Sequence, residues 1–206
     1  MHEAHAPEHP FTSLKEFLFH ILTISMGVLV ALAADAGVER MHRHELVEET
    51  KSAFTSQIDD NRKTISAYNL ATAQSDASLG RAIQLVDTDF LGAKHSLRAA
   101  PHEFLDLDTG SWEPAVATGA FNYMTIGRVR KYSQIHTNEL ELNKLSHENE
   151  DVWLQMAEFN EEAGEADKSD IRAVKKLLRE AAIYSKWIAI REKELLKLYD
   201  DAEGDK

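Results

Sequence analysis

The sequence predicts an all-α fold, with one N-terminal transmembrane helix that continues into an elongated antiparallel bundle of about four helices. Residues 17–34 contain no Asp, Glu, Lys or Arg. Later segments carry apolar residues three or four positions apart, which is the period of an amphipathic helix. Helix breakers are scarce, with 9 Gly and 4 Pro in 206 residues. We expect a polar His-rich tail over 1–13, a transmembrane helix over 14–38 and a helical bundle over 39–206, with a loop at about 100–114.

The apolar segment is long enough to cross a bilayer. At a rise of ~1.5 Å per residue, a helix over 14–38 exceeds the ~30 Å hydrocarbon core. One alternative is a buried core helix, and another is a cleavable signal peptide that ends at Ala31-Leu32-Ala33. One Lys and three Glu precede residue 17, whereas a signal peptide begins with positive charge. We therefore interpret the segment as a single-pass anchor in a lipid bilayer.

The charges that flank the segment predict its orientation. Lys15 is the one basic residue before it, whereas Arg40, Arg43 and Lys51 follow within twenty residues. Lys and Arg near the ends of a span tend to remain on the cytoplasmic side. We therefore expect the C-terminal bundle to be cytoplasmic.

Two features inside the span are candidates for contacts with other molecules. Gly27 and Ala31 form a small-xxx-small pair, which lets a second transmembrane helix approach closely. His20 lies about one turn inside the segment. We interpret it as an interfacial or helix-contacting side chain, and the alternative is a ligand of haem or of a pigment metal.

The N-terminal tail contains His2, His5 and His9. Three imidazoles on a short tract can bind zinc, nickel or copper. However, Pro7 and Pro10 oppose a helix that would hold these side chains in place. We favour a solvated tail over a metal site.

The spacing of apolar residues predicts where the helices of the bundle begin and end. The first helix continues from Val38 for about 34 residues without a turn signal. Apolar residues then disappear over Thr72–Ser78, where Ser75 can cap a helix. We therefore expect a hairpin there, followed by a second helix from Leu79 that ends before Pro101.

The third and fourth helices carry the most regular patterns, over about 127–162 and from Ile171 to Tyr199. Steps of three and four residues of this kind indicate packing against other helices. The expected seam of the third helix is Ile135, Asn138, Leu142, Leu145, Asn149, Val152, Met156 and Phe159. That of the fourth is Ile171, Val174, Leu178, Ala181, Ser185, Ile188, Glu192, Leu195 and Tyr199. On the fourth helix we expect Leu178, Ile188 and Leu195 to be buried and Lys175, Lys186 and Lys193 to be solvated.

Aromatic residues gather after the expected loop, at Trp112, Phe121 and Tyr123. We interpret this stretch as a helix end that packs against the bundle. The alternative is a ligand pocket lined by the three rings.

The chain carries none of the common motifs for catalysis or cofactor binding. It lacks GxGxxG, GxxxxGK[ST], HExxH and GxSxG. The absence of Cys excludes disulfides and thiolate metal sites. A formal net charge of −12 opposes binding to phosphate backbones. We predict a protein that is not an enzyme, uses no cofactor and binds no nucleic acid.

Two stretches resemble a group of uncharacterised bacterial single-pass inner-membrane proteins. The first runs from Pro10 to Leu32 as P-x-x-S-x-K-E-F-x-x-H-x-x-T-I-x-x-G-V-L-V-A-L, and it continues through Glu39, Arg40, His42, Arg43, His44, Leu46 and Val47. The second comprises Ser111, Trp112, Ala117, Gly119, Ala120, Tyr123, Met124, Val129 and Tyr132. The group tends to carry an apolar residue where this chain has Asp35. The resemblance implies an anchored helical protein of the bacterial inner membrane and supplies no catalytic residue.

Together these features predict a structural or accessory subunit of a larger membrane protein complex. Its partners would be the bilayer and other subunits, contacted through the transmembrane helix and a face of the bundle. Two alternatives remain at this stage. One is a sensory or ligand-binding bundle with a pocket near Trp112, and the other is a pigment- or haem-associated subunit that uses His20.

Overall fold

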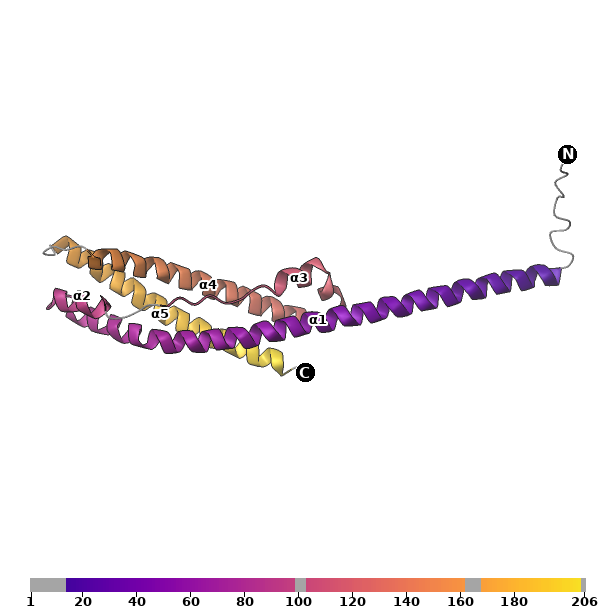
Figure 1. Ribbon diagram of the computed structural model, residues 1–206, viewed down its shortest axis with the longest axis horizontal. Coiled ribbons are helices and arrows are strands. Elements are labelled where there is room, and N and C mark those ends of the chain that lie inside the picture. Colours follow the sequence, from indigo (N-terminus) through magenta and orange to yellow (C-terminus); the bar gives the residue numbers. More distant parts are fainter. Residues whose placement is uncertain (1–13, 99–102, 162–167, 205–206) are drawn as a thin grey trace, which may run out of the picture. The chain divides into compact units, whose positions relative to one another are not determined.

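The structure is a computed structural model that describes residues 14–98, 103–161 and 168–204. These residues form helices joined by turns and one extended segment, and they contain no strand, so the all-α prediction is confirmed. The elements, labelled in Figure 1, are α1 (Leu14–Leu85), α2 (Phe90–Arg98), α3 (Trp112–Ala117), the 3₁₀ helix η1 (Ala120–Tyr123), α4 (Ile126–Glu161) and α5 (Lys168–Glu203).

The chain divides into two compact units, Met1–Glu48 and Glu49–Lys206, and α1 contributes to both. In the first unit α1 contains an 18-residue apolar stretch of which 0% is buried. By length and composition this helix can cross a membrane. A signal sequence near an N-terminus has the same character.

The hairpin expected at Thr72–Ser78 is wrong, because α1 continues without a break to Leu85. Thr72, Ser75 and Ser78 are buried, so small polar side chains occupy the core-facing positions of this part of α1. The hydroxyl of Thr72 donates to the carbonyl of Tyr68 at 2.8 Å, and a bond of this kind satisfies a polar group inside a helix interface. The segment from Leu79 therefore belongs to α1.

The chain turns instead over residues 86–89, after which α2 begins. The carboxylate of Asp89 accepts a hydrogen bond from the backbone N–H of Gly92 at 2.9 Å. A side-chain oxygen that caps the first turn in this way starts a new helix.

The core of the second unit is shared by the C-terminal half of α1 with α4 and α5, as Figure 1 shows. One cluster joins Ile58 of α1 and Ile135 of α4 to Leu195 near the end of α5. The other joins Ala82 of α1 to Leu178 near the start of α5, and it includes Val152 and Met156 of α4. Two separate core clusters therefore lie along the three long helices.

The seam predicted for the fourth helix is largely buried in α5. Val174, Leu178, Ala181, Ile188, Glu192, Leu195 and Tyr199 are buried, whereas Ile171 and Ser185 are half-buried. Lys186 and Lys193 are exposed as expected. The prediction that Lys175 is solvated is wrong, because its side chain is half-buried and forms an ion pair with Asp87.

The seam predicted for the third helix differs from the buried face of α4 at two positions, Asn138 and Leu145. Glu139 is buried, and the neighbouring Asn138, which the spacing favoured, is half-buried and donates to the carbonyl of Gln134 at 2.8 Å. Leu145 is also half-buried, and Asn149 is buried as predicted. The side chain of Phe159 lies outside the described residues.

Truncation of Leu178 to Ala should lower the free energy of unfolding by about 2–5 kcal/mol, because it removes apolar contacts and leaves a cavity. Lys193→Ala, on the exposed side of the same helix, should change it by less than about 0.5 kcal/mol. Thermal or denaturant melts of the two variants provide the comparison. Wild-type melting of Leu178→Ala would mean that α5 does not belong to a core within its own chain.

Candidate functional site

A buried carboxylate connects the three long helices at one level. Glu139 of α4 is 0% exposed and accepts three hydrogen bonds. Gln57 Nε2 donates to its Oε2 at 2.8 Å, and Asn61 Nδ2 donates to its Oε1 at 2.9 Å. The hydroxyl of Tyr199 on α5 donates to the same Oε1 at 2.7 Å. These four side chains are called the Glu139 cluster below.

The charge state of the Glu139 cluster results from two opposing effects. Burial raises the pKa of Glu139, because the ionised form loses its hydration. The hydrogen bonds from Tyr199, Gln57 and Asn61 lower the pKa of Glu139, but burial is the larger effect, so the pKa stays above its usual value. Burial also raises the pKa of Tyr199, so its hydroxyl stays protonated and acts as a donor.

The two amides of the Glu139 cluster also bind the backbone of an extended segment, residues 103–109, and of the turn that follows it. Asn61 donates to the carbonyl of Asp108 at 2.8 Å and accepts from the N–H of Asp108 at 2.8 Å. Gln57 Oε1 accepts from the N–H of Ser111 at 2.8 Å. Each amide thus donates to the buried carboxylate through its nitrogen and accepts from a backbone N–H through its oxygen.

Side chains of α4 bind the same segment from the other side. Asn143 accepts from the N–H of Leu107 and donates to its carbonyl, both at 2.8 Å. Ser146 accepts from the N–H of Leu105 at 2.8 Å. Side-chain amides therefore supply the hydrogen bonds that a neighbouring strand would supply, while Leu105 and Leu107 are buried in the core.

Trp112, Phe121 and Tyr123 were expected to pack against the bundle, with a ligand pocket as the alternative. The rings of Trp112 and Phe121 are 4.9 Å apart, and both pack against the core cluster that contains Phe54. The ring of His136 stacks on Trp112 at 5.0 Å. Tyr123 is exposed, so it does not join the other two in the core. Trp112 and Phe121 pack as we favoured, and a ligand pocket there stays a prediction.

A second buried carboxylate, Glu192, lies on the core side of α5. It is 5% exposed, and its Oε1 has no hydrogen-bond partner among the residues that the structure describes. Burial raises its pKa from 4.5 to about 7; a hydrogen bond from Asn69 opposes the shift, and the charge of Asp76 adds to it. Burial and the charge of Glu192 in turn raise the pKa of Tyr68 on α1.

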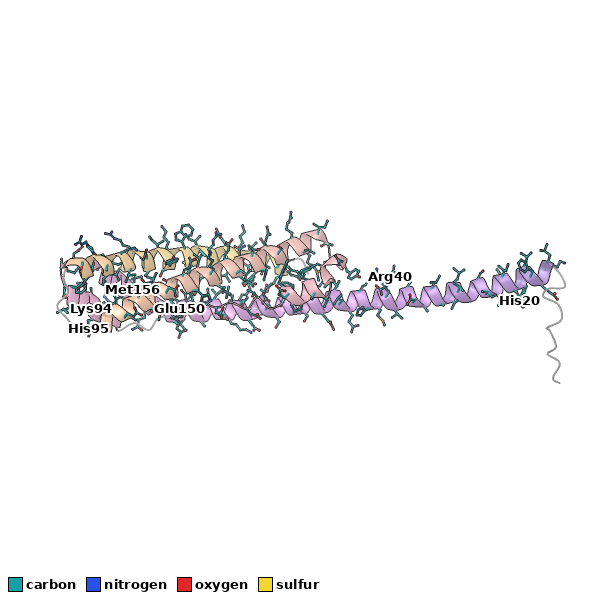
Figure 2. All side chains as sticks on the ribbon, turned by 90° about the horizontal axis from the view of Figure 1, so that it is seen from above. His20, Arg40, Lys94, His95, Glu150 and Met156 are labelled. Atoms are coloured by element: carbon teal, nitrogen blue, oxygen red, sulfur yellow. The ribbon has the colours of Figure 1, made fainter. Side chains whose placement is uncertain are left out.

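The other candidate residues belong to the first unit. His20 is exposed on α1, with its Nδ1 3.1 Å from the carbonyl of Glu16 (Figure 2). Gly27 and Ala31 are exposed on the same helix. His2, His5 and His9 lie outside the described residues. Among the residues that the structure describes, no three His, Asp or Glu are arranged to hold a metal ion.

Sequence reasoning missed the Glu139 cluster. Gln57 and Asn61 precede and follow Ile58 at positions that continue the core face of α1, and all three are buried. The signal was present in the spacing, since Phe54, Ile58, Asn61 and Ile65 follow one another by four, three and four. The spacing does not identify the acceptor, which is Glu139 of α4.

No known protein family, curated protein or solved structure matches this chain. The arguments about function therefore rest on the residues and contacts of the chain itself.

Replacement of Glu139 by Gln should destabilise the protein although it preserves size and removes a buried charge. The NH₂ group of the new glutamine side chain would face the NH₂ group of Gln57, which is also a donor. The amide of Gln57 cannot rotate to present its oxygen instead, because that oxygen already accepts from the N–H of Ser111. An unsatisfied buried donor costs about 1–3 kcal/mol, which a denaturant titration can measure.

The matched control is Glu141→Gln on the same helix. Glu141 is exposed and lies 3.4 Å from Arg191 in a surface ion pair, so its loss should change the free energy of unfolding by less than about 1 kcal/mol. Equal effects of the two substitutions would contradict a special role for the Glu139 cluster.

Glu192→Gln should stabilise the protein at about pH 8 and have little effect at about pH 4. In the folded chain Glu192 binds its proton more tightly than in the unfolded chain, so its contribution to stability is present below 4.5 and is lost as pH rises through about 7. A shift of this size corresponds to a gain of up to about 3 kcal/mol for the Gln variant at high pH.

The measurement is the difference in unfolding free energy between wild type and variant across this pH range. Glu194→Gln is the control, since Glu194 is exposed on the same helix. A stability difference for Glu192→Gln that stays constant with pH would show that the carboxylate titrates normally.

Proposed function

We propose that this chain is a non-enzymatic, membrane-anchored helical protein that serves as a structural or accessory subunit of a larger membrane protein complex. The observation that carries the proposal is the apolar stretch of α1, of which 0% is buried. Its large exposed side chains are Phe17, Leu18, Phe19, Ile21, Leu22, Ile24, Met26, Val28, Leu29, Val30 and Leu32.

This surface needs a cover from outside the chain. At about 1.5–3 kcal/mol for each large apolar side chain, leaving these residues in water costs on the order of 20 kcal/mol. The second unit has a core of its own, made by α1, α4 and α5. The bilayer is the cover that fits a single apolar helix.

The polar side chains of the stretch are compatible with lipid. Thr23 Oγ1 donates to the carbonyl of Phe19 at 2.9 Å, and His20 lies within hydrogen-bond distance of the carbonyl of Glu16. Such bonds within the helix reduce the cost of placing a polar side chain in a bilayer.

The remaining parts of the proposal concern the environment of each unit. We place the span in a bacterial inner membrane and the second unit, as an elongated antiparallel bundle, in the cytoplasm. Flanking Lys and Arg support this orientation. Gly27 supports contact with a second transmembrane helix, because a side chain at this position would meet no other atom within 4 Å.

The anchor can be tested by washing membranes with alkaline carbonate. The full chain should remain in the pellet, and its N-terminal peptides should be detected by mass spectrometry. A double variant Leu22→Arg/Leu29→Arg should be washed out, since each Arg costs about 2.5–3.5 kcal/mol at the centre of a span.

Leu70→Arg is the matched control, because Leu70 is an 83% exposed leucine of the second unit. This variant should be retained like the wild type. A mature chain that begins near Ala34 would identify the stretch as a signal peptide. Protease protection of the C-terminus in inside-out vesicles would contradict the cytoplasmic placement.

A further inference from the structure

The outward face of α5 differs from the rest of this acidic protein. From position 172 to 197, its exposed residues are Arg172, Ala173, Lys176, Arg179, Ile183, Lys186, Trp187, Ala189, Ile190, Lys193, Glu194 and Lys197. Six of them are basic and one is acidic, while the whole chain has a net charge of −12. This set of residues is called the α5 face below.

Most of the basic side chains of the α5 face pair with no acid in the part of the chain that the structure describes. Among the described residues, Arg179, Lys186, Lys193 and Lys197 form no ion pair. The exposed acid, Glu194, binds Arg191 at 2.9 Å, and the carboxylate of Glu180 lies 3.8 Å from Lys176. A field of one sign along a helix favours a partner of the opposite sign.

The centre of the α5 face is apolar. Ile183, Trp187 and Ile190 follow one another by four and three residues, so they lie side by side on the helix. Trp187 is 53% exposed, and the two isoleucines are exposed to a similar degree. This strip lies opposite Leu178, Ile188 and Leu195, so the core does not account for it.

The arrangement resembles an interface anchor surrounded by a charged rim. Trp and Arg dominate the energetic centres of protein interfaces, and a polar rim excludes water from them. The i, i+4, i+7 spacing is the one that packs against another helix. A second copy related by a two-fold axis would bring the α5 faces of both copies together, and their like charges would repel each other.

We propose that the α5 face docks an acidic helical surface of another protein subunit, in which an apolar strip is flanked by Asp and Glu. The proposal rests on the proposed function, because it names the face through which an accessory subunit would join its complex. Ile183, Trp187 and Ile190 meet the partner's apolar strip, and the flanking lysines and arginines meet its carboxylates.

The test is site-specific photo-crosslinking of the full chain in its native membrane, with Trp187→benzoylphenylalanine. We expect an adduct in which the contacted peptide belongs to another protein and is rich in Asp and Glu. Leu70→benzoylphenylalanine is the matched control on the exposed side of α1. An adduct with lipid, with nucleic acid or with a second copy of the chain would overturn the proposal, as would no adduct above this control.

Charge reversal supplies the second measurement. Lys186→Glu/Lys193→Glu should lower the adduct yield by about tenfold or more, as should high salt, because the attraction is electrostatic. Lys63→Glu/Lys144→Glu, which changes the same total charge on α1 and α4, should leave the yield unchanged. Unaltered melting of both variants shows that folding is retained, and equal yields would overturn the proposal.

The outcomes also separate this proposal from the proposed function. A chain that carbonate removes from the membrane contradicts the anchor, whatever the crosslinks show. A chain that stays anchored and co-purifies with other subunits, but gives no adduct at position 187, contradicts the α5 face alone.

Discussion

Burial of the Glu139 carboxylate is the constraint on which the second unit depends. An ionised group without water is costly unless hydrogen-bond donors surround it. Here the donors come from α1 and α5, so the three long helices must stay in one register for the group to be satisfied. A carboxylate that loses its donors is left as an uncompensated buried charge, which is strongly destabilising.

The same constraint determines the path of the chain between α2 and α3. Gln57 and Asn61 point their N–H groups at Glu139, which leaves their oxygens for the backbone of Ser111 and Asp108. Asn143 of α4 binds Leu107 in the same manner. An extended segment is therefore stable along a helical core without a strand beside it, because side chains satisfy part of its backbone hydrogen bonding.

The two units bury apolar surface in different ways. The second unit packs Phe54, Ile135 and Leu195 against each other, whereas 0% of the apolar stretch of the first unit is buried. The α5 face combines both features on a smaller scale, with Trp187 exposed among basic residues. Exposed apolar surface in a folded chain indicates where another molecule binds.

Sequence patterns alone predict the all-α fold, the apolar segment and the positions of the last two helices to within about four residues, because hydrophobic periodicity is local information. They also predict most of the α5 seam around Leu178 and Leu195. Only the tertiary structure decided that α1 passes through Thr72–Ser78, since small polar residues there are buried by other helices rather than exposed in a turn. The Glu139 cluster likewise required the tertiary structure, because its members are up to 82 residues apart and the spacing within one helix does not identify a partner on another helix.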